Sequence, residues 1–230
     1  MIGIIGAMEQ EVSQLQSEME NVEKIVKAQM TFYKGKLCGQ DAVVVQSGIG
    51  KVNAGICAQI LVDNFEVTAL INTGVAGALD NRLNIGDMVI STDAVQHDMD
   101  VVPLGYAKGQ IPGVEVLAFP ADAELVEKAV EANKEANPEI GTFTGRVASG
   151  DQFIAEKGVK DGIINNFQAM CAEMEGAAIA QTAYLNQVSY VIIRAISDKA
   201  DNSATMDYPA FEREAIVHSV RLVKNLMGRM

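Results

Sequence analysis

The run Met1-Ile-Gly-Ile-Ile-Gly-Ala7 is apolar throughout, which predicts a strand buried on both faces of a sheet. Residues 9–20 follow it directly and show helical spacing through Val12, Leu15 and Met19. The glycine and alanine that end the run suit a tight turn from strand to helix. A buried strand that passes straight into a helix indicates an α/β protein.

The alternation of strands and helices continues along the rest of the chain. Further strands are expected at residues 68–72, 87–96, 142–148, 169–172 and 189–196. Further helices are expected at residues 122–137, 175–185 and 209–227, and after the glycine-rich turn 47–55 up to about residue 64. Residues 31–37 and 42–46 flank a turn and predict a hairpin, so the central sheet must be mixed rather than wholly parallel.

Residues 110–120 contain two prolines and a glycine and predict a loop, which is a candidate lid or interface segment. No linker, internal repeat or low-complexity tract divides the sequence, so residues 1–230 are expected to form a single domain. A chain of this length can bury about 70% of the surface of its unfolded state, which is enough for a substantial core.

Composition narrows the classes of function. The formal net charge of −12 opposes binding to nucleic acid or to an anionic membrane. No apolar run approaches the roughly 20 residues of a membrane span, and the N-terminal stretch lacks the basic start of a signal peptide, so a cytoplasmic protein is expected. Cys38, Cys57 and Cys171 are odd in number and lack Cys-x-x-Cys spacing, which predicts reduced, mostly buried thiols rather than a disulfide framework or a zinc site.

Several familiar motifs are incomplete. Gly48-Ile-Gly-Lys51 is similar to phosphate-binding turns, but Asn53 stands where the dinucleotide fingerprint requires glycine, and Val52 where the P-loop requires serine or threonine. NAD and ATP are therefore not expected, and the turn is better explained as a place where the backbone approaches another group closely. No Gly-x-Ser-x-Gly elbow is present, which disfavours a serine hydrolase.

The two histidines are His97 and His218. His97 lies in His97-Asp-Met-Asp100, but no second histidine or acidic cluster at ligand spacing accompanies it. We expect a hydrogen-bonded structural histidine at this position, and neither a metal nor another cofactor in the protein.

Glu11, Glu175 and Asp198 differ from the other acidic residues because each follows or ends an apolar run. If these runs are strands of one sheet, the three carboxylates are expected to converge at its edge, where α/β proteins bind their ligands. Acids at such an edge, with few basic neighbours, predict acid/base chemistry on a neutral or cationic small molecule.

Each of these acids also has a structural explanation. Glu11 is equally suited to an exposed position in the first turn of a helix. Glu175 is suited to a helix N-terminus, where the macrodipole stabilises negative charge. Asp198 is suited to an ion pair with Arg194 at the end of a strand.

Six motifs occur along the chain: Gly3-Ile-Ile-Gly-Ala-Met-Glu-Gln-Glu11, Ser47-Gly-Ile-Gly-Lys-Val52, Asn72-Thr-Gly-Val-Ala-Gly77, Ser149-Gly-Asp-Gln-Phe-Ile154, Glu173-Met-Glu175 and Arg194-Ala-Ile-Ser-Asp198. In this order they resemble the 5′-methylthioadenosine/S-adenosylhomocysteine nucleosidases, bacterial enzymes of the purine nucleoside phosphorylase superfamily. The resemblance implies a single α/β domain with a mixed sheet partly closed into a barrel, and a homodimer. It also implies hydrolysis of the N-glycosidic bond of both nucleosides to adenine and a 5-alkylthioribose, in methionine salvage and the methyl cycle.

The resemblance further implies roles for individual residues. Asp198 would be the general acid beside adenine N7, and Glu11 would activate the attacking water. Glu175 would hold the ribose hydroxyls with help from the backbone of Met174. The ring of Phe153 would stack on adenine, while the backbone of Ile154 would contact its edge. Two carboxylates held apart suit the cleavage of a glycosidic bond, because the leaving group needs a proton and the sugar needs a nucleophile on its opposite face.

The remaining contacts implied by the resemblance surround the ribose and its 5′ substituent. Met8, Ile49 and Tyr208 would line the ribose and alkylthio pocket, and Val75, Ala76, Gly77 and Ser197 would complete the lining. Val101, Leu104 and Pro112 would reach into the site of the neighbouring subunit. Val75 stands where a serine is usual, so no side-chain hydroxyl is available there, and Tyr208 stands where a phenylalanine is usual.

Other functions on the same fold remain open. A purine nucleoside phosphorylase must bind phosphate, but Met8, Glu9 and Glu11 stand near the first glycine turn and Lys51 is the one nearby cation, so hydrolysis is favoured over phosphorolysis. A futalosine hydrolase differs mainly in the 5′ substituent of its substrate and is a closer alternative. A non-enzymatic nucleoside-binding protein is expected to lack at least one of the three acids, and all three are present.

Overall fold

Strand β1 (Ile2–Gly6) is buried along its whole length and runs parallel to β4 (Gln40–Gln46) and β5 (Ala69–Ala78). This position follows from its sequence, because a strand without polar side chains needs cover on both faces of the sheet. The structure is a computed structural model that describes residues 1–200 and 204–230. A buried strand followed by a helix, α1 (Glu9–Ser17), is confirmed, although the helix ends earlier than expected.

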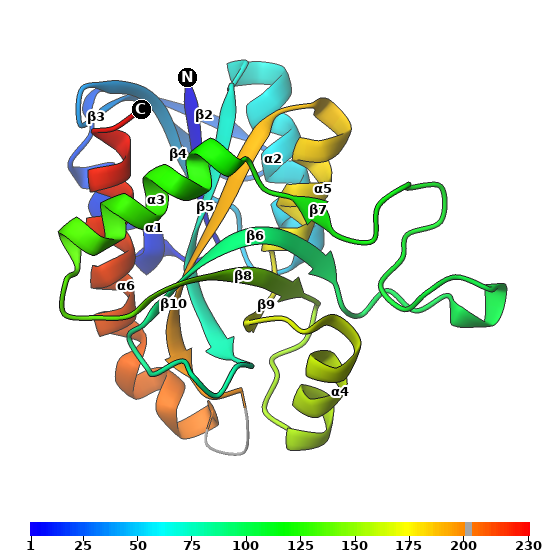
Figure 1. Cartoon of the computed structure of the whole chain (residues 1–230). Coiled ribbons are helices and arrows are strands. Elements are labelled where there is room, and N and C mark those ends of the chain that lie inside the picture. The colour runs from blue at the N-terminus through cyan, green and yellow to red at the C-terminus, as the bar shows by residue number, and fades with distance from the viewer. Residues whose placement is uncertain (201–203) are drawn as a thin grey trace.

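The sheet closes on itself through β5. This strand also pairs in parallel with β10 (Ser189–Asp198) and antiparallel with the short β9 (Cys171–Glu173). The circuit continues from β10 to β6 (Met88–Gln96), from β6 to β8 (Thr142–Ser149), and from β8 back to β9. Five strands therefore enclose a mixed barrel (Figure 1).

The rest of the sheet extends from one side of this barrel. Beyond β1 and β4 lie β3 (Met30–Leu37) and the edge strand β2 (Glu20–Lys27), while β7 (Phe119–Pro120) adds a short pairing with β6. Within residues 1–200 and 204–230, ten strands form one continuous sheet. The expected class, α/β with a mixed sheet partly closed into a barrel, is confirmed.

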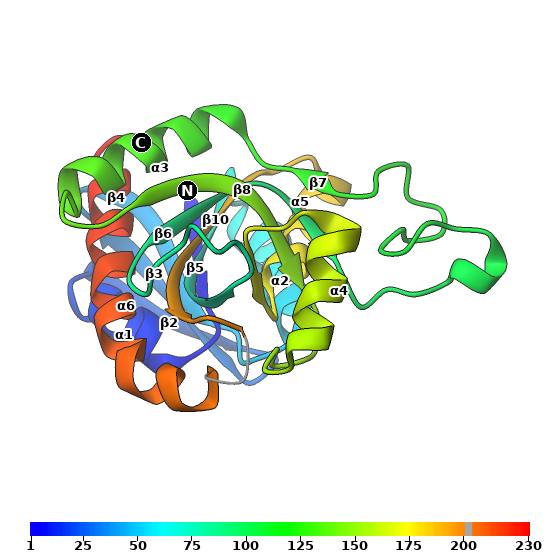
Figure 2. The same cartoon turned by 60° about the horizontal axis from the view of Figure 1, so that its bottom comes forward.

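Helices cover the sheet on two sides (Figures 1 and 2). On one side α2 (Lys51–Phe65) packs against α5 (Gly176–Asn186). On the other side α6 (Ala204–Met227) packs against both α1 and α3 (Ala123–Ala136). A further helix, α4 (Lys157–Phe167), lies beside β8. None of the helices in the described part of the chain combines the length and apolar character needed to cross a bilayer.

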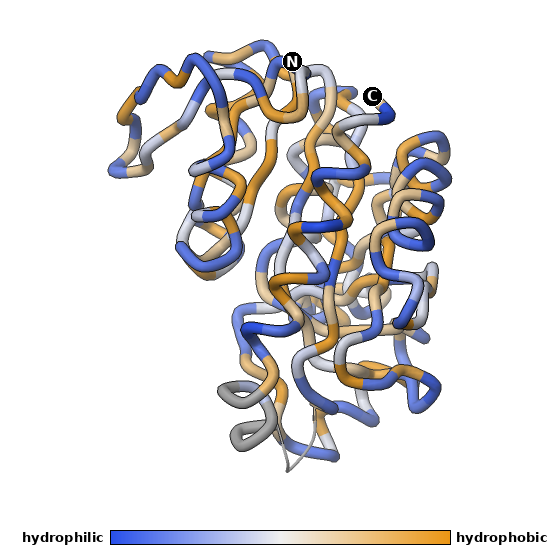
Figure 3. Tube along the Cα trace, turned by 90° about the vertical axis from the view of Figure 1, so that its left-hand side faces the viewer, coloured by the Kyte–Doolittle hydropathy of each residue, from blue (hydrophilic) through white to orange (hydrophobic). Residues whose placement is uncertain are grey.

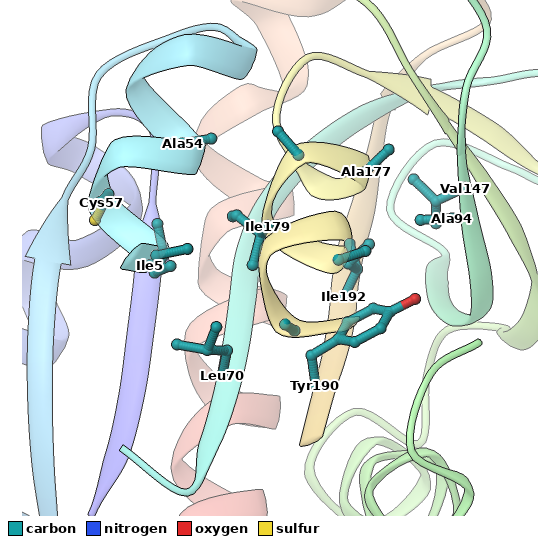
Figure 4. Packing of buried hydrophobic residues seen from close by; sticks show 14 of the residues in the cluster. Ile5, Ala54, Cys57, Leu70, Ala94, Val147, Ala177, Ile179, Tyr190 and Ile192 are labelled. Carbon is teal, nitrogen blue, oxygen red and sulfur yellow. The ribbon is translucent and has the colours of Figure 1, made fainter. Parts of the chain in front are cut away.

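Each helix layer covers its own apolar core, because successive residues of a strand point to opposite faces of the sheet. Ile5, Leu70 and Ile192 lie in the core that includes Ala54 of α2 and Ile179 of α5 (Figure 4). Their neighbours Ile4, Ile71 and Ile193 belong to the core beneath α1, α3 and α6. Each such side chain stabilises the fold by about 1.5–3 kcal/mol when it is fully buried. Along the covering helices polar and apolar residues alternate, as the hydropathy colouring shows (Figure 3).

A long connection between β6 and β7 projects from the barrel, on the right in Figures 1 and 2. It comprises residues 97–118, here called the projecting segment, and contains one short 3-10 turn, Val102–Leu104. Its tip is apolar, since the side chain of Leu104 is 72% exposed and that of Val102 is 49% exposed. The loop expected at residues 110–120 thus forms the second half of this longer segment as far as residue 118, whereas its last two residues form β7.

The sequence did not predict β2, α4 or the two-residue strand β7. Strand β2 is almost entirely exposed at the edge of the sheet, so its sequence lacks the apolar alternation by which a strand is recognised. Helix α4 contains Gly158 and Gly162, which weaken its helical pattern.

Candidate active site

A cavity of about 360 Å³ opens where the ends of β1, β5, β9 and β10 meet, a volume within the usual range for small-molecule sites. Its lining includes every residue that was expected to contact a ligand bound to the same chain: Met8, Glu11, Ile49, Val75, Ala76, Gly77, Phe153, Ile154, Met174, Glu175, Ser197, Asp198 and Tyr208. Five further residues complete the lining: Ala7, Gln152, Ala172, Glu173 and Ala200. The expected convergence of Glu11, Glu175 and Asp198 is therefore observed, although Glu175 follows a strand antiparallel to β5.

Glu11 is held by backbone N–H groups in the first turn of α1. Its Oε2 accepts hydrogen bonds from Ala7 N at 2.7 Å and Met8 N at 2.9 Å, and its Oε1 accepts one from Val75 N at 3.2 Å. The residue is only 3% exposed, so the alternative of a solvent-facing acid is wrong. Burial raises the pKa of the Glu11 carboxyl, against the opposing effects of Arg194 and of these donors. Val75, which offers no hydroxyl, thus contributes through its backbone.

Glu175 stands directly before α5, where its carboxylate meets the turn that precedes α2. Gly50 N donates to Glu175 Oε1 at 2.9 Å. Gly50 has φ +98°, which favours glycine, so the interpretation of this turn as a close backbone approach agrees with the structure. Burial raises the pKa of Glu175 to about 7; the neighbouring carboxylate of Glu173 adds to the rise, while Arg194 and the Gly50 N–H oppose it. Such a group changes its charge near neutral pH.

Arg194 lies behind the acids and is fully enclosed, with 1% of its surface exposed. Its guanidinium forms a short ion pair with Glu173, lies 3.5 Å from Glu175 Oε2, and donates to Asn72 Oδ1 at 2.5 Å. Arg194 therefore pairs with the glutamates, and the alternative that it forms an ion pair with Asp198 is wrong. Arg194 and Asp198 lie four residues apart in β10 and contact different neighbours, which their proximity in sequence could not reveal.

Glu173 is a site residue that sequence reasoning missed. It accepts hydrogen bonds from the backbone N–H groups of Glu175 and Gly176 and from the Ser149 hydroxyl, in addition to the Arg194 contact. It therefore fixes the backbone that carries Glu175. The signal was its place directly after the strand expected at residues 169–172 and two residues before Glu175; in the structure Glu173 is the last residue of β9, so both acids stand at the same strand end.

Asp198 ends β10 and lies against β5. Its Oδ1 accepts from Ala200 N at 2.7 Å, and the Ser197 hydroxyl donates to its Oδ2 at 3.0 Å. The residue is 2% exposed. A side chain at Gly77 would place its Cβ 2.8 Å from Asp198 Oδ1, so the glycine gives the carboxylate room beside the strand.

Apolar side chains form the opposite wall of the cavity. The ring of Phe153 is half exposed and forms a T-shaped contact with the Tyr208 ring, with centroids 5.9 Å apart and planes at 85°. The Tyr208 hydroxyl donates to Glu212 Oε1 at 2.7 Å and lies 3.4 Å from Met8 Sδ. The cavity thus has an acidic side, at the strand ends, and an apolar side suited to a flat ring and a thioether.

Val101, Leu104 and Pro112 lie in the projecting segment and do not line the cavity of their own chain. Their contribution to a partner's cavity stays a prediction.

The cavity lining, taken over the described residues, contains no lysine or arginine. Lys51, the cation near the glycine turn, donates instead to Asp98 Oδ1 at 2.6 Å and to Gln96 Oε1 at 3.0 Å. The described residues also contain no group of three or more His, Cys, Asp and Glu side chains placed to hold a metal ion. The groups that the lining offers to a ligand are carboxylates, backbone N–H groups, the polar side chains of Gln152, Ser197 and Tyr208, and apolar surfaces.

The histidines and cysteines lie outside the lining. His97 is buried, and within the described residues its Nε2 has no hydrogen-bond partner, so the expectation of a structural histidine satisfied by hydrogen bonds is not met at this atom. Burial lowers the pKa of His97. All three cysteines are free; Cys57 and Cys171 are buried as expected, whereas Cys38 is exposed.

Comparison with known proteins agrees over the full length of the chain. The family model described as the phosphorylase superfamily matches residues 1–227. The 5′-methylthioadenosine/S-adenosylhomocysteine nucleosidase of Staphylococcus carnosus (strain TM300) is 44% identical over 230 residues, which are 99% of each chain.

Solved structures show the same fold. That of the 5′-methylthioadenosine/S-adenosylhomocysteine nucleosidase from Neisseria meningitidis, in complex with methylthio-immucillin-A, has a TM-score of 0.96 at 37% identity and covers 100% of this chain and 99% of that one. The futalosine hydrolase of Helicobacter pylori strain 26695 has a TM-score of 0.94 at 31% identity, covering 100% of this chain and 97% of that one. Because sequence and fold agree from end to end, the chain belongs to the phosphorylase superfamily and, within it, to the 5′-methylthioadenosine/S-adenosylhomocysteine nucleosidases.

Proposed function

We propose that the protein hydrolyses the N-glycosidic bond of 5′-methylthioadenosine and S-adenosylhomocysteine, releasing adenine and a 5-alkylthioribose. The observation that carries this proposal is the pair of buried carboxylates held apart along β5. Glu11 is anchored at Val75 N, and Asp198 lies against Gly77. Two residues of strand separate these anchors by roughly 7 Å. Glycosidases in which a water attacks the sugar also use two carboxyl groups held apart, with room for that water between them.

The two carboxylates divide the chemistry. In this proposal Asp198 donates a proton to N7 of the purine, which makes adenine a better leaving group. Glu11 accepts a proton from the water that attacks the anomeric carbon. The N–H groups that bond to Glu11 hold it in place for this role. Protonation of the base and attack on the sugar then take place on opposite sides of the breaking bond.

The remaining lining residues bind and orient the substrate. Glu175, whose Oε1 already accepts from Gly50 N, accepts hydrogen bonds from the ribose 2′- and 3′-hydroxyls, next to the Met174 backbone. Phe153 stacks on the purine, and the Ile154 backbone contacts its edge. Met8, Ile49 and Tyr208 enclose the alkylthio group, in keeping with the apolar character of that wall.

The charge of the cavity supports hydrolysis over phosphorolysis. Phosphate would have to enter a lining whose ionisable side chains, among the described residues, are four acids and one tyrosine. The nearby cations are already engaged, Arg194 by Glu173 and Lys51 by Asp98. An anion would therefore find repulsion and no free basic partner.

Futalosine hydrolysis is the second candidate. Its support is the likeness to the Helicobacter pylori futalosine hydrolase. Because that substrate differs mainly at the 5′ end, the discriminating contacts are those of Met8, Tyr208 and the partner's projecting segment. Adenine nucleosides with an apolar 5′ substituent suit the Met8 and Ile49 side chains better.

We also propose that the protein is a homodimer in the cytoplasm and serves methionine salvage. Exposed apolar side chains lie on α2 and on the projecting segment, at Val52, Ile56 and Leu104. Apolar surface of this extent usually marks an interface. The free thiols of Cys57 and Cys171 suit a reducing compartment.

The test is incubation with 5′-methylthioadenosine in phosphate-free buffer, followed by separation of the products. Free adenine and free methylthioribose are expected, at a rate that added phosphate leaves unchanged. S-adenosylhomocysteine and futalosine, assayed in parallel, rank the candidate substrates. Formation of a ribose 1-phosphate, or no release of a base, would contradict the proposal.

A further inference from the structure

Lys51, Asp98 and Asp151 form a closed ring of polar contacts outside the cavity. Lys51 Nζ donates to Asp98 Oδ1 at 2.6 Å, and Asp151 N donates to Asp98 Oδ2 at 3.0 Å. Asp151 Oδ1 in turn accepts from Lys51 N at 2.8 Å, which closes the ring. None of the three residues lines the cavity, and none has a part in the proposed chemistry.

The ring joins three segments that are far apart in the sequence. Lys51 begins α2, Asp98 follows β6 and leads into the projecting segment, and Asp151 follows β8. Helix α2 begins after Gly50, which has no side chain to cap its N–H groups, so Asp151 supplies the acceptor from another loop. The fit is close, since a Cβ at Gly50 would lie 3.1 Å from Asp151 Oδ1.

Two of the joined segments carry groups that face the cavity. Gly50, next to Lys51, donates its N–H to Glu175 Oε1 at 2.9 Å. Phe153 lies two residues after Asp151 and forms part of the apolar wall. The ring therefore fixes the turn that holds Glu175 and the loop that carries Phe153 against each other.

The ion pair in the ring is also partly shielded from solvent, which strengthens it. The side chains of Lys51 and Asp98 are 16% and 21% exposed. Lys51 and the Asp151 N–H hold the pKa of Asp98 below its ordinary value although burial opposes this, so the ion pair persists at neutral pH. Lys51 also contacts Gln96, which donates to Gln181 of α5 at 2.6 Å and so ties the ring to the helix that Glu175 precedes.

We propose that Lys51, Asp98 and Asp151 are positioning residues that hold the Gly50 N–H against Glu175 and thereby set the recognition of the ribose hydroxyls. The inference rests on the proposed function for the identity of the substrate. It assigns a role to the Gly48–Lys51 turn that no phosphate-binding motif explains.

Loss of the ring contacts is expected to change the pKa of Glu175. The Gly50 N–H and Arg194 lower the pKa of Glu175, whereas burial, Glu173 and Glu11 raise it. Without the Gly50 contact the Glu175 carboxyl takes up its proton at higher pH and loses its fixed orientation. Preference for a substrate with both ribose hydroxyls should fall, and the acid limb of the pH profile should move upward.

The experiment compares Asp151→Ala, Asp151→Asn and Lys51→Met with the wild type, using 5′-methylthioadenosine and its 2′-deoxy analogue. The readout is kcat/KM for 5′-methylthioadenosine divided by kcat/KM for the 2′-deoxy analogue. Asp151→Ala and Lys51→Met should lower this ratio about fivefold to tenfold, the scale of one or two lost hydrogen bonds. Both should move the acid limb of kcat/KM to higher pH. Asparagine keeps an oxygen that accepts from Lys51 N, so Asp151→Asn should stay within about twofold of wild type.

Matched controls use the exposed pair Lys36–Asp41, which lies on the β3–β4 hairpin. Lys36→Met and Asp41→Ala should leave the ratio and the pH profile unchanged. Thermal unfolding of every variant, followed by circular dichroism, separates a loss of fold from a loss of positioning. Folded ring variants with the wild-type ratio and pH limb would overturn the role of the ring. A wild-type protein that releases no adenine would instead overturn the proposed function on which it rests.

Discussion

At the scale of single residues, the contacts that stabilise the start of α1 also hold the proposed general base, Glu11, in a fixed position. Glu11 caps the first turn of its own helix by accepting from Met8 N, yet it reaches across to β5 and faces the cavity. A carboxylate in this setting is fixed by backbone groups that cannot rotate away. Its structural role and its proposed chemical role are compatible because the carboxylate has more lone pairs than its N–H donors use.

Neutral isosteres of the two proposed acid/base residues should separate chemistry from binding. Glu11→Gln and Asp198→Asn are each expected to lower kcat by about 100-fold or more, the usual contribution of one general acid or base, with a much smaller change in KM. Steady-state kinetics with 5′-methylthioadenosine measure both parameters. Near-normal turnover in either variant would show that its carboxyl group does not act in the reaction.

The pKa of Glu175, about 7, predicts how activity depends on pH. The ribose hydroxyls need an ionised acceptor, so kcat/KM for 5′-methylthioadenosine should fall as the pH drops below about 7. In Glu175→Gln this limb should be absent, and loss of the charged acceptor should penalise the ribo substrate more than its 2′-deoxy analogue. A pH profile of the variant with the same limb as the wild type would assign the titration to another group.

The same raised pKa predicts that the free energy of unfolding decreases as the pH rises, whereas the activity increases. Between the ordinary value of 4.5 and about 7, the folded chain keeps a proton on Glu175 that the unfolded chain has lost. Stability conferred by this group therefore falls as the pH rises through that window and stays lower above it. Glu175→Gln should raise the free energy of unfolding at pH 8 by on the order of 2 kcal/mol and change it little at pH 4. Denaturant unfolding at both pH values checks this, and a less stable variant at pH 8 would contradict it.

At the scale of elements, β5 is the strand on which the site is assembled. Val75 donates to Glu11, Gly77 gives room to Asp198, and Gly74 lies beside both Glu11 and Arg194. A Cβ at Gly74 would overlap the Arg194 guanidinium and the Glu11 carboxylate. The glycines of β5 are therefore needed because they let the charged side chains of Glu11, Arg194 and Asp198 approach the backbone closely. None of these glycines has a positive φ, so backbone conformation alone does not require glycine there.

Gly74→Ala is therefore expected to displace two buried charged groups at once. Activity should fall at least about as far as in Glu11→Gln, and stability should drop by roughly 3 kcal/mol or more, as when a buried ion pair is disrupted. Gly158→Ala in α4 is the control, because its Cβ would meet nothing within 4 Å; it should stabilise the protein by up to about 1 kcal/mol. Assays of adenine release and thermal melts of both variants test this prediction. An active and stable Gly74→Ala variant would show that β5 can shift to accommodate the added methyl group.

The elements that the sequence predicted well are those in which burial determines which positions are apolar. β1, β5 and β10 are apolar because both faces are covered, and the ends of β1 and β10 were placed within two residues, close enough to predict that Glu11 and Asp198 meet. The end of β5 was wrong, because this strand continues to Ala78, six residues beyond its expected end at residue 72. β2 was missed because an edge strand with charged side chains carries no such pattern, and those charges suit an edge that must not pair further. Side-chain direction was also out of reach, so the engagement of Arg194 by Glu173 could not be foreseen.

The sequence predicted which residues line the cavity better than it predicted the hydrogen bonds and ion pairs between them. The lining residues were largely those that the family resemblance implied, but the raised pKa of Glu175 depends on its burial and on two carboxylates, Glu173 and Glu11, that the fold brings close to it. The ring of Lys51, Asp98 and Asp151 likewise joins residues 47 to 100 positions apart, through contacts that no local pattern encodes. Long-range polar contacts of this kind depend on the closed barrel.

At the scale of the whole molecule, the projecting segment is the feature that a single chain does not explain. Leu104 is 72% exposed at its tip, and the segment does not cover the cavity of its own chain. An isolated chain gains nothing by presenting apolar side chains on a long excursion from the barrel. In the two-fold dimer that we propose, the same segment would be buried against the partner, and one interface would then serve two sites.

Leu104→Asp should therefore weaken dimerisation and raise the KM for 5′-methylthioadenosine together, because an unpaired carboxylate buried beside a thioether carries a desolvation penalty of about 2 kcal/mol or more. Val26→Asp is the matched control: Val26 is 68% exposed on the edge strand β2, outside the proposed interface, and its replacement should leave both quantities unchanged. Sedimentation velocity and kinetics on the same preparations measure the two effects. A fully dimeric Leu104→Asp variant with the wild-type KM would place residue 104 outside both the interface and the pocket, whereas a dissociated variant with an unchanged KM would show that each subunit completes its own site.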